Sequence, residues 1–369
     1  MKQLLYFLIL TFIISCGSVS NPEVAVNNLQ RPPGVSEAQT DHIFNTLRYY
    51  PNQTQLSIAS IDDTSAVFYG AIRAGDTLQT IDNKDSVFEI GSLSKVFTST
   101  LLANLVHHNK LMLNQPIQAY LDFPLNDSLQ VSFLELANHT SGLPRIPSGF
   151  IRESLWHMDN PYKDYNEKKL RDYMSNNMEP DHEPGSTFQY SNIGAGILGY
   201  VLTRIEGQSY EEMLQQKIFQ PLEMQHSTTQ RAFVNDKLVA GLSKRGKTAS
   251  NWDLGAIPGA GAILSTSEDL VKFGQANFDR DNKIMKLQRQ ETFSIDNDRA
   301  MALGWFILKR DSTTKWYWHN GGTGGYRSSM VLDVDNRKGV IVLSNISAGH
   351  SHAAQIDSLS YSLLRELRK

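Results

Sequence analysis

Three short polar motifs lie far apart in this chain, and any fold it adopts must accommodate them. They are Ser92-Leu-Ser-Lys95, Tyr190-Ser-Asn192 and His319-Asn-Gly321. A serine three residues before a lysine shares a helix face with it, so the Lys95 amine can reach the Ser92 hydroxyl. Such a pair alone is common on helix surfaces. Here apolar residues follow on more than one face, from Val96 to Val106, which predicts a buried helix whose lysine has a polar role.

The order of the motifs resembles that of the serine β-lactamase and penicillin-binding protein superfamily, most closely its branch of class C β-lactamases, DD-peptidases and esterases. Four longer blocks in family order are also similar, at 136–144, 184–192, 259–270 and 319–326. The resemblance covers roughly residues 36–369. It implies an α+β, β-lactamase/transpeptidase-like fold, in which a five-stranded antiparallel sheet is flanked by N- and C-terminal helices and a helical lobe is inserted.

The residue patterns predict the elements of such a fold. Apolar and β-branched runs bounded by turn residues predict strands at 56–61, 66–72, 316–319, 328–334 and 339–345. Helical spacing predicts helices at 41–49 and 356–367, and the middle of the chain, 96–277, is expected to be mostly helical. We expect one β-lactamase-related serine hydrolase domain at 38–369. Its α/β lobe takes about 38–95 and 300–369 and its helical lobe about 96–299, with the active site between them.

The resemblance implies a catalytic role for Ser92, Lys95 and Tyr190. Ser92 is the predicted nucleophile, at the N-terminal end of a helix whose free amides favour developing negative charge. Ser94 is a competing serine, but it lies off the Lys95 spacing. Lys95 is expected to be a partly desolvated amine or ammonium that touches Ser92. Tyr190 is expected near both residues, and the sequence leaves open whether Lys95 or Tyr190 accepts the serine proton.

The same resemblance implies the substrate-binding residues Asn192, His319, Asn320, Gly321 and Arg327. Asn192 is expected to hydrogen-bond Lys95 and a substrate amide. The segment from His319 is expected to form the inner edge strand of the sheet, where glycines leave room for a substrate backbone. The amide of Gly322 is predicted to pair with that of Ser92 as an oxyanion hole.

The residue at 319 departs from the β-lactamase pattern, in which a lysine usually stands there and helps to hold a substrate carboxylate. A histidine with a reference pKa of about 6.5 is only partly charged at neutral pH. Recognition of a carboxylate is therefore less certain from the sequence, and Arg327 is close enough along the chain to help.

The N-terminus predicts export and lipid anchoring. Met1-Lys2 precedes the apolar run Leu4–Ile14, which is too short to span a bilayer and is typical of a signal peptide, predicted at residues 1–15. Cys16 follows a small residue, as at a bacterial lipoprotein processing site, and is predicted to be lipidated. Residues 16–37 are predicted to form a tether. Cys16 is the only cysteine, so an internal disulfide is excluded.

Several other classes of function are disfavoured. The net charge is −3 and the basic residues are dispersed, so no nucleic-acid partner is predicted. No cofactor or metal site is predicted, because no histidine has a ligand partner at suitable spacing. His139 and Ser141 are expected in a structural loop beside the cleft. The remaining noted histidines are expected on the exposed surface, and they are His107, His108, His350 and His352.

The sequence therefore predicts a serine hydrolase of the bacterial cell envelope, acting through an acyl-enzyme at Ser92 on β-lactams or D-amino-acid peptides such as peptidoglycan stem peptides. A carboxylesterase acting on small acyl esters is the alternative, because it would use the same residues. A catalytically silent binding or sensing module is a third hypothesis. That hypothesis is disfavoured because Ser92, Lys95 and Tyr190 are all present.

Overall fold

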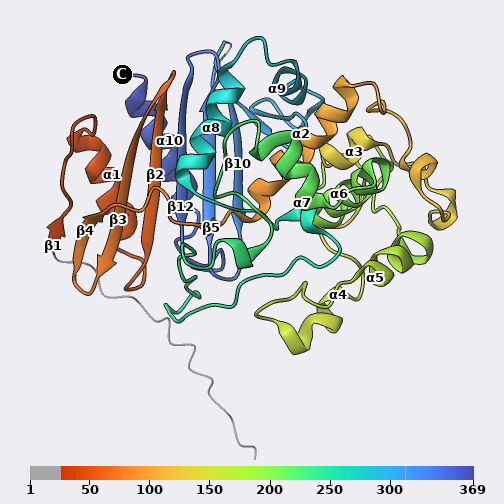
Figure 1. The fold of residues 1–369 in the computed structure, drawn as a ribbon, viewed down its shortest axis with the longest axis horizontal. Helices are drawn as coiled ribbons and strands as arrows, with labels where there is room; N and C mark the ends of the chain where they lie inside the picture. Colours follow the sequence, from red (N-terminus) through yellow and green to blue (C-terminus); the bar gives the residue numbers. More distant parts are fainter. Residues whose placement is uncertain (1–25, 312) are drawn as a thin grey trace, which may run out of the picture.

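A computed structural model describes residues 26–311 and 313–369, in which ten strands form one mixed sheet (Figure 1). The strand order is β1-β4-β3-β2-β12-β11-β10-β9-β8-β7, and each pair is antiparallel except β1 with β4. A separate short ladder joins β5 and β6. The strands are β1 (Val26–Asn28), β2 (Gln55–Asp62), β3 (Ser65–Ala74), β4 (Thr77–Ile81), β5 (Phe88–Glu89), β6 (Leu264–Ser265), β7 (Phe293–Ser294), β8 (Arg299–Met301), β9 (Phe306–Lys309), β10 (Lys315–Gly322), β11 (Arg327–Asp333) and β12 (Lys338–Ser344).

The five predicted strands are all present and adjacent, as β3, β2, β12, β11 and β10, but the prediction of a five-stranded sheet is wrong. Five further strands extend the sheet at its two edges. These additions contain two to five residues each, which is too short to show an alternating apolar pattern. They pair through backbone hydrogen bonds, which any non-proline residue type can make.

Helices cover both faces of the sheet. The helices are α1 (Glu37–Leu47), α2 (Ser94–His107), α3 (Phe133–Ala137), α4 (Phe150–Glu153), α5 (Glu167–Asp172), α6 (Asn192–Glu206), α7 (Tyr210–Leu214), α8 (Ser267–Phe278), α9 (Lys283–Gln288) and α10 (Gln355–Leu367). The predicted helices at 41–49 and 356–367 correspond to α1 and α10, which contact each other. α1 begins earlier than predicted because Ser36 caps it, in a capping box with Gln39.

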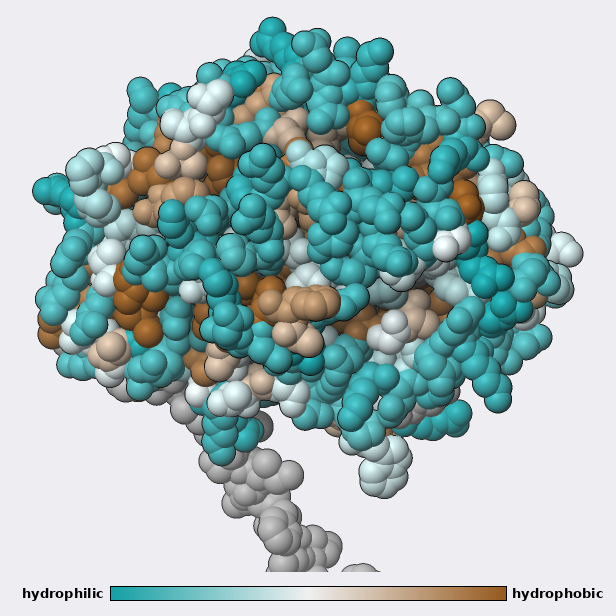
Figure 2. All heavy atoms as spheres, in the orientation of Figure 1, coloured by the Kyte–Doolittle hydropathy of each residue, from teal (hydrophilic) through white to brown (hydrophobic). Residues whose placement is uncertain are grey.

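The alternation of apolar side chains in the central strands divides the core into two layers. Ile58 and Val340 point to the side covered by α1 and α10, whereas Ala59 and Ile341 point to the side covered by α8. The other helices gather beside the β10 end of the sheet, around α2 (Figure 1). Hydrophilic side chains cover most of the visible surface, with hydrophobic ones in separate patches (Figure 2).

The described residues begin inside the predicted tether, and this part of the prediction is wrong. β1 pairs with β4, and the Tyr69 hydroxyl donates a hydrogen bond to the Gln30 carbonyl at 2.8 Å. Val35 packs against the core beneath α1. The segment from residue 26 therefore belongs to the folded domain. The predicted signal peptide, Cys16 and the start of the tether lie outside the described residues. In the part of the chain that the structure covers, no helix is long and apolar enough to cross a bilayer.

Candidate active site

Ser92 lies in a tight turn that leads into α2. The turn is a single 3-10 element, η1 (Gly91–Leu93), and Ser92 is partly exposed on a cleft. Gly91 has a φ of 52°, and a Cβ there would lie 2.6 Å from the amide nitrogen of Gly322. Only glycine fits both the backbone angle and this close approach. The turn therefore brings the Ser92 segment against the end of β10.

Lys95 occupies the first turn of α2 and is almost completely buried. Its Nζ lies 3.1 Å from Ser92 Oγ and donates to the Ala260 carbonyl at 2.7 Å. The pKa of Lys95 is held far below its ordinary value, first because burial removes water from the ammonium and second because Arg145 adds a like charge nearby. The neutral amine is therefore favoured, and it contacts the serine oxygen.

Ser94, the competing serine, faces away from this contact. Its side chain is fully buried, and its Oγ accepts a hydrogen bond from the Ile263 amide at 3.1 Å. The hydroxyl thus fixes the chain at Ile263 against α2. Of the two serines, only Ser92 lines the cleft.

Tyr190 joins Ser92 and Lys95 from a distant part of the sequence. It lies just before α6, and Lys95 Nζ is 5.1 Å from the centre of its ring. Burial raises the pKa of Tyr190 to about 12, although a hydrogen bond with Ser92 lowers it in part. The phenol therefore stays protonated at neutral pH. The structure brings the three residues together, as the resemblance implied.

Two neighbours hold Tyr190 in place. The His139 ring packs on Tyr190 with 4.4 Å between the ring centres, and its Nδ1 accepts from the Ser191 amide at 3.3 Å. Ser191, for which the sequence suggested no role, caps α6 by accepting from the Gly194 amide at 2.9 Å. Ser141 accepts from the Leu143 amide at 3.4 Å, as expected of a turn residue.

Only the second half of β10 has an edge that is open toward Ser92. β9 pairs with Lys315–Trp318, so β10 is not an edge strand throughout, and the stretch from His319 to Gly322 lacks a partner on that side. The η1 turn lies there instead. A Cβ on Gly321 would lie 1.8 Å from the Ile90 carbonyl oxygen. Gly321 therefore makes room for the protein's own backbone, not for a substrate as predicted.

His319 is buried and neutral, which corrects the prediction of a partly charged side chain. Its Nδ1 lies 2.6 Å from the Asn320 carbonyl oxygen, which can only accept, so this nitrogen carries the proton. Burial, which removes water from the charged form, lowers the pKa of His319 to about 3. Its Nε2 is buried without a hydrogen-bond partner among the described residues.

Asn320 and Arg327 both bind a carboxylate of α10. The Asn320 amide donates to Asp357 Oδ2 at 2.9 Å, and the Arg327 guanidinium forms an ion pair with the same oxygen. Neither side chain lines the cleft. The prediction that Arg327 helps to hold a substrate carboxylate is therefore not supported by its position.

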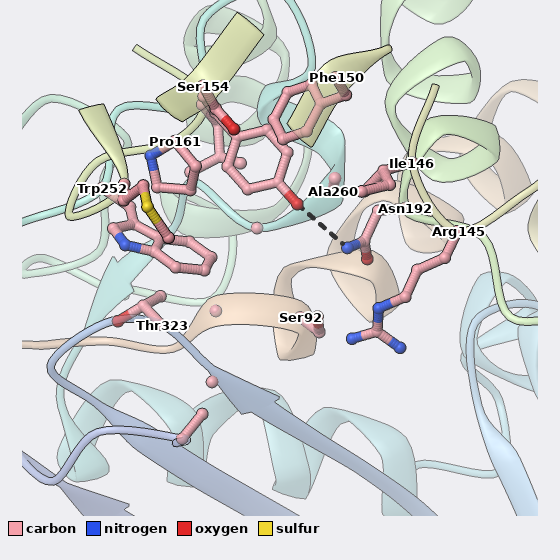
Figure 3. Close-up of a pocket in the computed structure, with 17 residues that line it drawn as sticks. Ser92, Arg145, Ile146, Phe150, Ser154, Pro161, Asn192, Trp252, Ala260 and Thr323 are labelled. Atoms are coloured by element: carbon pink, nitrogen blue, oxygen red, sulfur yellow. Dashed lines mark hydrogen bonds between the residues drawn. The ribbon is translucent and has the colours of Figure 1, made fainter. Parts of the chain in front are cut away.

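Asn192 lines the cleft at the start of α6, but it does not form the predicted hydrogen bond with Lys95. Its Nδ2 lies 3.4 Å from the Tyr162 hydroxyl (Figure 3), whereas the hydrogen bonds of Lys95 go to Ser92 and Ala260. In the described structure its Oδ1 has no hydrogen-bond partner.

The cleft has a volume of about 400 Å³ and is walled mainly by apolar side chains (Figure 3). Those apolar residues are Ile146, Phe150, Met158, Pro161, Trp252, Leu254, Ala260 and Ala348. Arg145 also lines the cleft, and sequence reasoning missed it. It directly follows the block at 136–144, and that adjacency was the one available signal.

The other histidines do not form a metal centre in the described part of the chain, which holds no cluster of three or more potential ligands. His107 and His108 are exposed as expected. His350 is buried, contrary to expectation, because its ring packs edge-on against Tyr50 with 5.3 Å between centres. His352 is partly buried, and its ring stacks on Tyr49.

Comparison with known proteins decides the family. The family model described as beta-lactamase matches residues 56–360. The chain belongs to the β-lactamase family. It is 26% identical over 367 residues to the D-alanyl-D-alanine-carboxypeptidase/endopeptidase AmpH of Escherichia coli K12, covering 90% of this chain and 87% of that one.

Two solved structures share the fold of this chain. A β-lactamase/D-alanine carboxypeptidase from Pseudomonas syringae superposes with a TM-score of 0.73 at 21% identity, covering 89% of this chain and 98% of that one. A β-lactamase/D-alanine carboxypeptidase from Yersinia pestis also gives 0.73, at 22% identity, covering 89% and 96%. The predicted family and the predicted α+β fold are thereby confirmed.

Proposed function

We propose that this β-lactamase-family protein is a serine hydrolase that forms an acyl-enzyme at Ser92 and acts on D-alanyl peptides or β-lactams. One observation carries the proposal: the buried, neutral amine of Lys95 lies 3.1 Å from the hydroxyl of Ser92, and Ser92 lines a cleft. The substrate class is supported by the relatives, whose names state D-alanine carboxypeptidase or β-lactamase activity.

The geometry suggests a division of labour. Lys95 takes the Ser92 proton as the serine oxygen attacks the substrate carbonyl, because its amine is neutral and in contact. Tyr190 keeps its proton at neutral pH, passes it to the leaving atom and is then reprotonated with the proton that Lys95 took from Ser92. The amides of Ser92 and Gly322 hold the oxyanion, a role worth about 3 kcal/mol per donor. Water then releases the acyl group.

The proposed base predicts a particular dependence of acylation on pH. Lys95 acts in its neutral form, so the acylation rate should fall as the pH drops through its lowered pKa. The rate should level off well below pH 10.5, the ordinary lysine value, and should not decline again until near pH 12, where Tyr190 ionises. The measurement is the second-order rate of adduct formation against pH.

The control for this profile is the His319→Asn variant. His319 has a pKa of about 3, so it should cause no change in acylation rate near pH 6–7. The pH at which the acylation rate rises should therefore be the same in this variant as in the native protein. If the rise in acylation rate with pH disappears in this variant, the rise reflects the titration of His319, and the role of Lys95 is contradicted.

The function is tested by intact-protein mass spectrometry of the folded domain, residues 26–369, mixed with a penicillin and followed over time. A transient adduct accompanied by turnover of a chromogenic cephalosporin supports a β-lactamase. A lasting adduct, with release of D-alanine from a D-Ala-D-Ala peptide, supports a carboxypeptidase. Hydrolysis of p-nitrophenyl esters with neither adduct nor D-alanine release would instead establish the esterase alternative.

We also propose that the chain is exported and held to a membrane of the cell envelope by acyl chains on Cys16. The support is the leader-like run at residues 4–14 and the small residue before Cys16. In a bacterial host, the full chain should fractionate with membranes, and Cys16→Ala should move it to the soluble fraction. If both forms fractionate alike, lipid anchoring at Cys16 is wrong.

A further inference from the structure

The cleft contains a single charged side chain among the described residues that line it, namely Arg145. Arg145 is exposed, and no described carboxylate forms an ion pair with it. Figure 3 shows its guanidinium beside Ser92, on the same side as Asn192. A positive charge without a partner in an otherwise apolar cleft is available to a ligand.

The other basic groups near Ser92 are not available to an anionic substrate. His319 is buried and neutral, and Arg327 is paired with Asp357 on α10. Lys95 is buried, and its Nζ is already bound to Ser92 and the Ala260 carbonyl. Among the described residues that line the cleft, Arg145 is therefore the group that confers positive potential.

The backbone fixes Arg145 next to the nucleophile. Its carbonyl oxygen accepts from the amides of Asn192, at 2.9 Å, and Ile193, at 3.4 Å, at the start of α6. Its guanidinium carbon lies 5.1 Å from the centre of the Tyr190 ring. This cation–π contact occupies none of the N–H groups with a hydrogen bond, so they remain available to bind a carboxylate with two hydrogen bonds.

We propose that Arg145 forms a subsite for a carboxylate of the substrate, on the Asn192 side of Ser92. This inference rests on the proposed function, because the subsite serves the acyl donor that Ser92 attacks. It deepens that function by naming the residue that selects acyl donors with a carboxylate. The sequence predicted that the substrate carboxylate binds on the β10 side of the cleft. The proposed subsite places it instead on the opposite side, near the start of α6.

The test uses aryl boronic acids. A reactive serine binds them directly, so the natural acyl donor does not have to be known. The Ser92 oxygen gives an electron pair to boron, the boronate becomes tetrahedral and the serine proton goes to Lys95. The probes are the 3- and 4-carboxyphenylboronic acids and their uncharged methyl esters. Calorimetry gives the affinity ratio of each acid to its ester, in which any effect of Arg145 on Lys95 cancels.

The native protein should bind at least one of the two acids more tightly than its methyl ester. In Arg145→Gln, the ratio of acid affinity to ester affinity should fall by about 10- to 100-fold, which corresponds to the loss of a charge-assisted hydrogen bond. Arg145→Lys should restore part of the ratio. Arg245→Gln is the matched control, because it removes the same charge from an exposed loop, and it should leave the ratio as in the native protein.

The possible failures are distinguishable. If both probes bind and Arg145→Gln keeps the native ratio, the carboxylate subsite is wrong while the reactive serine stands. If neither boronic acid binds the native protein, or if both bind equally well to Ser92→Ala, Ser92 is not the nucleophile. The proposed function and the subsite then fail together.

Discussion

Replacing Ser92 with alanine is expected to abolish the covalent penicillin adduct and to lower hydrolysis by about 10⁴-fold or more, because the attacking oxygen is lost. The change removes one partly exposed oxygen, whose hydrogen bond to Lys95 lies at the cleft floor, so the fold should be kept. Intact mass after incubation with penicillin measures the adduct, and thermal unfolding checks the fold.

Ser94→Ala is the matched control. It removes a hydroxyl two residues away that points at the Ile263 amide, so the adduct should still form. Unfolding should become easier by about 1–3 kcal/mol, because the buried amide loses its acceptor. If Ser92→Ala still acquires the adduct and Ser94→Ala does not, the two serines have been assigned in the wrong order.

Replacing Lys95 with methionine is expected to slow acylation by about 10³-fold or more, a loss typical of removing a positioned general base. Methionine has a similar length and fills the buried space left by the lysine stem. Removing a buried amine relieves a desolvation cost, whereas the Ala260 carbonyl loses its donor, so stability should change by only about 2 kcal/mol in either direction. Adduct formation rates and urea unfolding measure the two effects.

Lys110→Met provides the comparison for Lys95. Lys110 lies on the surface just beyond α2 and pairs with Glu206, so its loss should cost only the value of a surface ion pair, up to about 1 kcal/mol, and acylation should be unaffected. If Lys95→Met acylates as fast as the native protein, another group accepts the serine proton, and Tyr190 becomes the candidate to examine.

The central part of the sheet was predictable because its strands are long enough to show a pattern. β2, β3, β10, β11 and β12 each contain seven to ten residues, and the apolar ones fill two core layers. The short strands at the edges carry no such pattern. β1 could not be distinguished from a tether, because its three residues are all exposed and held by backbone pairing to β4.

Some of the residues around Ser92 were likewise predictable from the sequence, and others were not. The motifs and their resemblance to the family were enough to propose Ser92, Lys95 and Tyr190 as reacting groups, because acyl transfer requires a nucleophile, a base and a proton donor within reach of one another. The motifs could not show which positively charged side chain in the cleft is available to a ligand. Arg327 lies closer to the His319 motif in sequence than Arg145 does. However, Arg327 forms an ion pair with Asp357 of α10, a helix on the other face of the sheet.

The sequence by itself determined the family and the central strands and pointed to the three proposed reacting groups, since motifs and strand patterns depend on residue type and local spacing. Only the tertiary structure decided that His319 is neutral, that Gly321 accommodates the Ile90 carbonyl and that Arg145 is the charged side chain among the described residues that line the cleft. Charge state and access depend on burial and on through-space distances to residues elsewhere in the chain, and packing sets those distances.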